Sequence, residues 1–287
     1  MNVLILGATG MLGNVLFDYF SSKKDEFLVY GTIRQAKDKE LFNDSYQDNL
    51  FFIRDKNLEI SLDELLSQFN PDFVINCIGL IKQEKMASEY IQTINVNSLI
   101  PHKIKEMLNG SKCKLIHFST DCVFSGNKGN YSESDLPDAR DLYGLSKLLG
   151  EVNDENHLTI RTSIIGHELK KSLGLLEWFL SQQNDVVGFS NAIFSGLTTL
   201  EVAKMLHHYV FSNENISGLY HVASTPISKY ELLKLIGKFY KTSIKIHKSA
   251  EPKINRSLDQ SNFFQMTNYK APPWEEMICD MYNWGKK

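Results

Sequence analysis

A tyrosine and a lysine four positions apart could supply acid chemistry in this chain. They are Tyr143 and Lys147 in the stretch "YGLSK", and they share one face if residues 140–153 form a helix. A phenol with a pKa of about 10 is a poor acid at neutral pH, but a neighbouring ammonium stabilises the phenolate and is expected to lower that pKa. The same ammonium could bind a nicotinamide ribose. Because this spacing is common by chance, the pair needs support from the rest of the chain.

A threonine upstream offers that support. Thr120, in "HFSTDCVF", follows an apolar run that we expect to be a strand, so its hydroxyl would lie at the carboxyl edge of a sheet. There Thr120 and Tyr143 would polarise a substrate carbonyl, a nicotinamide would deliver hydride to carbon, and Tyr143 would deliver the proton. We therefore predict Thr120, Tyr143 and Lys147 as the catalytic residues.

The glycines of "GATGMLG" indicate a dinucleotide cofactor. Gly7 permits a tight turn after the first strand, Gly10 lets backbone approach a pyrophosphate, and Gly13 allows close packing of helix on strand. The phosphates would then lie on a helix N-terminus, where open N–H groups favour negative charge. We predict that the cofactor binds these residues of the turn: Gly7, Thr9, Gly10, Met11, Leu12 and Gly13.

The end of the second strand bears on the choice of cofactor. A protein that prefers NAD usually carries Asp or Glu there to hold the ribose 2′-hydroxyl, whereas "YGTIRQ" places Arg34 at this point. A guanidinium suits a 2′-phosphate, so NADPH is favoured and NADH is the alternative. Arg34 would have no such role if it is simply a solvated surface arginine.

Apolar runs alternate with amphipathic stretches through the first half of the chain. Strands this apolar on both faces belong inside a parallel sheet covered by helices. We expect strands at 2–6, 27–33, 50–53, 72–78, 114–119 and 158–163, and helices at 11–22, 61–69, 86–108 and 140–153. The fold class is therefore α/β, a doubly wound parallel sheet of the Rossmann type.

The rhythm changes after residue 162, where helical patterns alternate with short strands. We expect a dinucleotide-binding Rossmann domain over residues 1–162 and a smaller C-terminal substrate-binding lobe over 163–287, with some segments of the latter returning to the Rossmann core. No run of linker composition marks a clean boundary, and the sequence shows no internal repeat.

Composition excludes several classes of protein. The 287 residues carry a formal net charge of −3, which gives no basic excess for binding nucleic acid. The first residues lack the positive and apolar regions of a signal peptide or a membrane span, so we expect a cytoplasmic protein with no membrane partner. The cysteines, which are Cys77, Cys113, Cys122 and Cys279, show neither disulfide nor metal-ligand spacing, and we expect no metal.

Taken together, these motifs resemble the extended short-chain dehydrogenase/reductase superfamily, and within it the dTDP-4-dehydrorhamnose reductase group of nucleotide-sugar 4-keto reductases. The resemblance rests on "GATGMLG", "PDFVINCIG", "INVNS", "STDCVFSGNKGNYSESD", "YGLSKLLGE", "IRTSIIG" and "KINRSLDQSNF". It implies that the family's Thr, Tyr and Lys fall on Thr120, Tyr143 and Lys147, and that Cys77, Ile78 and Gly79 form a turn beside the nicotinamide. Asn95 falls where the superfamily often has a structural asparagine, although a place on the helix surface is an equal alternative.

The resemblance also narrows the reaction. Related 4,6-dehydratases carry an Asp-Glu pair after the threonine, whereas Asp121 is followed here by Cys122, so dehydration is disfavoured. The rhamnose-pathway reductases commonly have tyrosine where Cys122 stands, which changes the pocket. We expect NADPH-dependent reduction of a nucleotide-linked 4-keto-6-deoxy sugar for surface polysaccharide synthesis. An epimerase using bound NAD and a non-catalytic regulatory subunit are the alternatives, and a homodimer is a further expectation.

Four residues are predicted to bind the nucleotide-diphosphate sugar: Asp121, Phe194, Ser195 and Arg256. Phe194 and Ser195 lead into a helix at the expected height of the cleft. Arg256 lies in "KINRSLDQSNF", displaced from the position of the family's arginine, and offers a cation for the diphosphate unless it belongs to a solvated loop. Arg161 closes the sixth strand and could reach the substrate or pair with a carboxylate.

Overall fold

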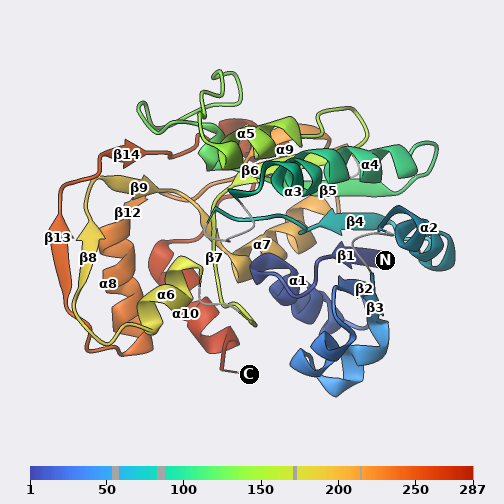
Figure 1. Ribbon diagram of the computed structural model, residues 1–287, viewed down its shortest axis with the longest axis horizontal. Coiled ribbons are helices and arrows are strands. Elements are labelled where there is room, and N and C mark those ends of the chain that lie inside the picture. The colour runs from blue at the N-terminus through green and yellow to red at the C-terminus, as the bar shows by residue number, and fades with distance from the viewer. Residues whose placement is uncertain (54–57, 83–87, 171–172, 214, 287) are drawn as a thin grey trace. The chain divides into compact units, whose positions relative to one another are not determined.

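The fold is built on a central sheet (Figure 1). The structure, a computed structural model, describes residues 1–53, 58–82, 88–170, 173–213 and 215–286. Within these ranges, seven strands form one sheet in the order β11-β6-β5-β4-β1-β2-β3. Their bounds are β1 (Asn2–Leu6), β2 (Leu28–Ile33), β3 (Leu50–Phe52), β4 (Phe73–Asn76), β5 (Lys114–Thr120), β6 (Leu158–Thr162) and β11 (Gly218–His221). Strands β1 to β6 lie in the spatial order of a doubly wound dinucleotide-binding sheet, and this order confirms the predicted fold class.

The helices of the first half follow the predicted pattern with shifted ends. They are α1 (Met11–Ser21), α2 (Leu58–Phe69), α3 (Tyr90–Ile94), the π-helical turn η5 (Asn95–Leu99), α4 (Ile100–Met107) and α5 (Leu142–Leu149). The expected helix 86–108 begins at Tyr90 in the structure, and residues 86 and 87 lie outside the described residues. None of the described helices is long and apolar enough to cross a membrane.

The helix expected over 140–153 is shorter at both ends. Asp141 precedes it, and its Oδ1 accepts a hydrogen bond from the Gly144 N–H at 3.1 Å, which caps the first turn. At the other end, a Cβ on Gly150 would lie 1.9 Å from the Asn97 carbonyl oxygen. Only glycine fits so close an approach, and the helix ends at Leu149, one residue before it.

Contacts between residues divide the chain into two compact units. Unit 1 comprises Met1–Ser119, Ser146–Thr159 and Ser217–Leu219, and unit 2 comprises Thr120–Leu145, Ile160–Ile216 and Tyr220–Lys287. The segment Thr120–Leu145 thus groups with the second half of the chain, which a single boundary at residue 162 does not anticipate.

Unit 1 has helices on both faces of its parallel strands. β1 pairs in parallel with β2 and β4, so that Leu4 lies between Tyr30 and Val74. Because strand side chains alternate, Leu4 and Val74 share one face, where they pack with Leu62 of α2 and Ile104 of α4. On the opposite face α1 packs against β2 at Gly31, where a Cβ would come within 2.8 Å of the Phe17 ring (Figure 1). Parallel strands buried on both faces explain the apolar runs in the sequence.

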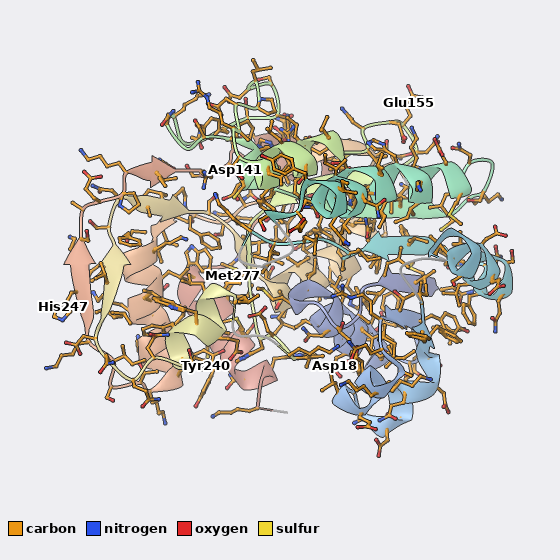
Figure 2. All side chains as sticks on the ribbon, viewed as in Figure 1. Asp18, Asp141, Glu155, Tyr240, His247 and Met277 are labelled. Carbon is orange, nitrogen blue, oxygen red and sulfur yellow. The ribbon has the colours of Figure 1, made fainter. Side chains whose placement is uncertain are left out.

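Unit 2 combines short strand pairs with helices. The strands are β7 (Ile164–Ile165), β8 (Val186–Phe189), β9 (Ala192–Phe194), β10 (Leu197–Thr198), β12 (Ile227–Ser228), β13 (Ile246–Ser249) and β14 (Ile254–Asn255), and the helices are α6 (Leu175–Leu180), α7 (Thr199–Met205), η7 (Leu206–Val210), α8 (Lys229–Tyr240), α9 (Ser261–Thr267) and α10 (Trp274–Trp284). Figure 2 shows Met277 on α10 and Tyr240 at the end of α8. Met277 is buried, whereas His247 on β13 is exposed and contacts Asp185 at 2.8 Å.

Candidate active site

The glycine turn of unit 1 has the geometry that its sequence predicts. Gly7 follows β1 with a φ of +81°, a conformation that residues with a Cβ rarely adopt. The Gly7 N–H donates to the Thr32 hydroxyl at 3.0 Å, which ties the turn to the end of β2. A Cβ on Gly13 would lie 2.2 Å from the Gly7 carbonyl oxygen, so glycine is required for α1 to pack on the turn.

Gly10 differs from the other two glycines, because packing within the chain does not require it. Its φ of −74° suits any residue, and a Cβ there would only reach ordinary contact distances of 3.4 and 3.9 Å. Gly10 precedes α1, and no described side chain caps the first turn of that helix. Open N–H groups beside backbone without a side chain suit a pyrophosphate, so these residues fit a dinucleotide.

Two further predicted cofactor segments lie at the same edge of the sheet. Arg34 directly follows β2, which runs parallel to β1, and its side chain is exposed. Cys77 follows β4, and its N–H donates to the Leu6 carbonyl at 3.0 Å, while its own carbonyl would lie 3.4 Å from a Cβ on Gly7. Ile78 and Gly79 continue from Cys77. Unit 1 therefore brings together the glycine turn, Arg34 and the turn at 77–79.

A buried asparagine and histidine hold that last turn, and sequence reasoning missed both. The Asn76 Oδ1 accepts the Ile78 N–H at 3.0 Å, so its amide nitrogen faces His117 Nδ1 at 3.1 Å and donates to it. His117 is therefore the neutral tautomer with its proton on Nε2, and its pKa lies well below the usual range because of burial and the nearby Lys147. Nε2 is buried without a hydrogen-bond partner among the described residues. Asn76 and His117 are partners across β4 and β5, a pairing that the sequence of either strand does not show.

Lys147 lies buried in unit 1, where it is 6% exposed. Its Nζ donates to the Phe118 carbonyl of β5 at 2.6 Å. Burial lowers the pKa of Lys147 to about 8, against opposing effects from Glu151 and Cys77. The ammonium is thus held at a fixed point and carries a charge that titrates near neutral pH.

Thr120 and Tyr143 come together in unit 2. Thr120 ends β5, and its hydroxyl accepts the Cys122 N–H at 3.1 Å. A side-chain hydrogen bond joins Thr120 and the Tyr143 phenol, which lies in the first turn of α5. The sequence predicted a lowered pKa for Tyr143, and that prediction is wrong for the protein without bound cofactor. Protein atoms around the phenol remove water from it and raise its pKa. The hydrogen bond from Thr120 lowers the pKa but offsets only part of this effect. Tyr143 is therefore fully protonated at neutral pH.

Asp121 is the centre of a polar cluster in the same unit. The side chain is 5% exposed, and burial raises its pKa against hydrogen bonds from Ser163 and Thr120 and the charge of Arg256. Arg256 Nε donates to the Phe124 carbonyl at 2.8 Å, which fixes the guanidinium. Two predicted substrate residues, Asp121 and Arg256, therefore lie near one another, and Ser163 is an additional member that the sequence did not suggest.

The other two predicted substrate residues have structural contacts. Phe194 is half-buried, and its ring lies 5.3 Å from that of Trp274. Ser195 is 3% exposed, and its hydroxyl accepts the Leu258 N–H at 3.0 Å. Ser195 thus joins the segment that carries Arg256 to the end of β9.

The structure also bears on two residues for which the sequence left alternatives open. Asn95 is exposed on the helix surface, whereas Asn97 is buried and bonds to the backbone of Leu80 at 2.8 and 3.1 Å, so the structural asparagine is Asn97. Arg161 contacts an imidazole, because its Nη1 lies 3.2 Å from His221 Nε2. Burial and Arg161 lower the pKa of His221 to about 4, so this histidine is neutral and accepts the bond.

A sequence model of one family, described as RmlD substrate binding domain, matches residues 1–284. Among solved structures, a hypothetical dTDP-4-dehydrorhamnose reductase from Sulfolobus tokodaii is 25% identical, with a TM-score of 0.76, over 96% of this chain and 98% of that chain. A dTDP-4-dehydrorhamnose reductase from Bacillus anthracis, solved in complex with NADP, is 21% identical with a TM-score of 0.79 over 99% of both chains. At 21% identity, the similarity to the Bacillus anthracis enzyme shows a shared fold alone.

Two kinds of protein are among the relatives that the chain matches. A probable low-salt glycan biosynthesis reductase, Agl14 of Haloferax volcanii, is 27% identical over 246 residues, which are 78% of this chain and 75% of the relative. Methionine adenosyltransferase 2 subunit beta of Xenopus laevis is 27% identical over 192 residues, which are 66% of this chain and 53% of the relative. The chain therefore spans about half the length of the adenosyltransferase subunit that it matches.

Proposed function

The chain belongs to the RmlD substrate binding domain family, and from that premise we propose that it uses NADPH to reduce the 4-keto group of a nucleotide-activated 4-keto-6-deoxy sugar. The observation that carries the proposal is the hydrogen bond between Thr120 and Tyr143, with Lys147 one turn further along α5. The glycan biosynthesis reductase among the relatives supports the same class of reaction. The product would serve synthesis of cell-surface polysaccharide.

The cofactor would be held by unit 1. The first turn of α1 with Gly10 suits the pyrophosphate, Arg34 suits the 2′-phosphate, and the turn at Cys77–Gly79 suits the nicotinamide half. Lys147 would bind the nicotinamide ribose through its ammonium. When bound, NADPH supplies hydride.

Tyr143 is the proton donor in this proposal. Its raised pKa keeps the phenol protonated at neutral pH, which is the form that reduction of a carbonyl requires. Thr120 holds the carbonyl oxygen beside the phenol, so that the proton has a short path. The Cys122 N–H bond to Thr120 fixes the hydroxyl in place.

The substrate would be held by residues of unit 2. Arg256 is a fixed cation for the diphosphate, and Asp121 beside it would accept a sugar hydroxyl. Phe194 would contact the substrate through its ring, and Ser195 would position the segment that carries Arg256.

A second candidate is a subunit of another enzyme. It is favoured by the match to methionine adenosyltransferase 2 subunit beta over 66% of this chain. Such a subunit would keep the cofactor site without catalysing reduction. Thr120, Tyr143 and Lys147 favour the reductase, because a subunit without catalysis has no chemical need for all three side chains.

One experiment separates the candidates. The protein is supplied with a panel of 4-keto-6-deoxy sugar nucleotides and NADPH deuterated at the transferring position. A reductase places one deuterium at C4 and oxidises one NADPH for each product. Isomerised sugar without net oxidation would indicate an epimerase that returns its hydride, and tight cofactor binding without any conversion would indicate the subunit.

A further inference from the structure

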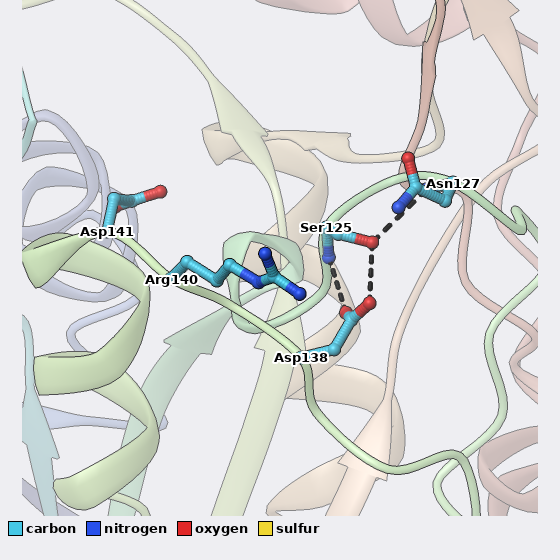
Figure 3. A pocket seen from close by; sticks show the side chains of 5 residues that line it. All are labelled: Ser125, Asn127, Asp138, Arg140 and Asp141. Carbon is cyan, nitrogen blue, oxygen red and sulfur yellow. Dashed lines mark hydrogen bonds between the residues drawn. The ribbon is translucent and has the colours of Figure 1, made fainter.

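A pocket of about 490 Å³ lies in unit 2 and has no role in the function proposed above. It is lined by Ser125, Asn127, Asp138, Arg140 and Asp141 (Figure 3). These residues come from two segments, one that follows β5 and its turn, and one that directly precedes α5. The pocket is thus formed by loops at both ends of the segment that joins Thr120 to Tyr143.

The two carboxylates of the pocket are engaged in holding its walls. Asp138 accepts hydrogen bonds from the Ser125 N–H and the Ser125 hydroxyl, both at 2.6 Å, and these bonds lower the pKa of its carboxyl. Asp141 caps the first turn of α5 through Gly144. Both acids therefore face chain atoms that satisfy them, and they fix the shape of the pocket.

Arg140 has no such engagement. Its side chain is exposed and extends between the two segments toward Ser125 (Figure 3). Within the part of the chain that the structure describes, its guanidinium makes no hydrogen bond and no ion pair closer than 4 Å, although the charge of Asp138 lies near enough to interact with it. A planar guanidinium presents five N–H donors in a fork that matches a carboxylate or a phosphate.

The pocket adjoins the residues that would handle the substrate. Asp141, in its wall, acts electrostatically on Tyr143 and contributes to raising the pKa of the phenol. Phe124, whose carbonyl accepts the Arg256 Nε–H, immediately precedes Ser125. A group bound beside Arg140 would therefore lie near Tyr143 and Arg256.

We propose that Arg140 binds an anionic oxygen group of the substrate in this pocket, either the diphosphate of the nucleotide, which it would share with Arg256, or a carboxylate on the sugar ring. The diphosphate suits the 6-deoxy sugar proposed above, whereas the carboxylate would require a uronic acid in its place. The inference rests on the proposed function, since it takes the substrate to be a nucleotide sugar. It goes beyond that function because it assigns recognition of the substrate's negative charge to Arg140, in the loop before α5. Asn127 would contribute its amide to the same group (Figure 3).

The test measures binding, so that it does not depend on turnover. Calorimetric titrations of the full chain saturated with NADP⁺ use UDP-glucose, UDP-glucuronic acid and dTDP-glucose, because the first two differ only by the carboxylate. Arg140→Ala should lose about tenfold to a hundredfold in affinity, the usual effect of removing a hydrogen-bond partner from a charged group. A loss with all three ligands identifies the diphosphate, and a loss confined to UDP-glucuronic acid identifies the carboxylate.

Two variants serve as controls. Arg140→Lys keeps the charge but not the fork and should recover part of the affinity. Lys128→Ala removes one positive charge from the same loop, where Lys128 pairs with Asp135, and should bind all three ligands as the wild type does. Because Arg140 is exposed, unchanged NADPH binding should show that the fold of the variant is intact.

Several results would overturn the inference. Arg140→Ala binding every ligand within twofold of the wild type would do so, as would an equal loss in Lys128→Ala. A wild-type chain that binds none of the three ligands would refute the pocket as a site for the anionic groups of UDP- and dTDP-linked sugars. Binding that depends on Arg140 in a protein without reductase activity would refute the reductase alone.

Discussion

The charge of Lys147 should make NADPH binding depend on pH near 8. Its amine is buried, donates to the Phe118 carbonyl at 2.6 Å, and has a pKa of about 8 in the chain by itself. The cause is burial, which removes water from the ammonium and favours the neutral amine. Since the proposed role of Lys147 in cofactor binding requires the ammonium, the protonated fraction should set the affinity.

The size of the effect follows from that pKa. About 90% of the protein carries the ammonium at pH 7 and about 10% at pH 9. If only the charged form binds, the apparent Kd of NADPH should rise about tenfold between these two pH values, which corresponds to about 1.4 kcal/mol. Bound NADPH should also stabilise the ammonium, so that binding at pH 9 takes up a proton.

Fluorescence titration of NADPH at pH 7, 8 and 9 measures the dependence, and calorimetry in buffers of different ionisation enthalpy measures the proton uptake. Lys147→Met should bind weakly and with the same Kd at all three pH values. Lys204→Met is the control, because Lys204 forms an ion pair with Asp280 and belongs to none of the predicted cofactor segments. That variant should keep the pH dependence of the wild type.

The reasoning would be refuted by a wild-type Kd that stays constant from pH 7 to 9. It would also be refuted if Lys147→Met kept the same slope, since another group would then carry the titration.

Four further substitutions test other parts of the site. Tyr143→Phe should reduce turnover by roughly two to four orders of magnitude with NADPH binding little changed, as stopped-flow kinetics would show, and near-normal turnover would remove Tyr143 from the mechanism. Gly13→Ala should lower the free energy of unfolding by about 1–3 kcal/mol in urea titrations, because its Cβ would lie 2.2 Å from the Gly7 oxygen. Gly10→Ala should cost less than about 1 kcal/mol of stability but weaken NADPH, and equal effects at both glycines would contradict the distinction between them. Arg34→Ala should weaken NADPH by about 1–3 kcal/mol and NADH much less, whereas equal losses would show that the 2′-phosphate is recognised elsewhere.

Local pattern was enough to predict the sheet and the turn at its edge. The apolar runs mark strands that are buried on both faces, and Gly7, Gly10 and Gly13 follow the first of them. Because parallel strands end at one edge, the ends of β1, β2 and β4 had to meet there. Strand order thus accounts for the position of the glycine turn and Arg34 at one edge, whereas the turn at Cys77–Gly79 was expected there from the family resemblance alone.

What the sequence could not supply depends on tertiary packing. Asn95 and Asn97 lie two positions apart in one helix, and only the position of Leu80 shows that Asn97 is the buried one. The role of Arg140 depends on a pocket between two loops, which has no periodic pattern in the sequence. The hydrogen bonds from Ile78 through Asn76 to His117 likewise cross two strands.

Burial acts on Tyr143 and Lys147 in the same chemical direction, toward the neutral form of each group. For Tyr143 this preserves the proton that a reductase must donate, whereas for Lys147 it weakens the charge that a cofactor would need. Substitution of Tyr143 therefore tests proton donation, whereas substitution of Lys147 tests cofactor binding. Loss of the Tyr143 phenol would disable a reductase and an epimerase alike, because a reductase needs an acid at the C4 oxygen and an epimerase needs a base and then an acid at the same atom. The Lys147 titration reports on the cofactor and the deuterium at C4 reports on the reaction, so the two measurements together separate a reductase from a protein that only binds NADPH.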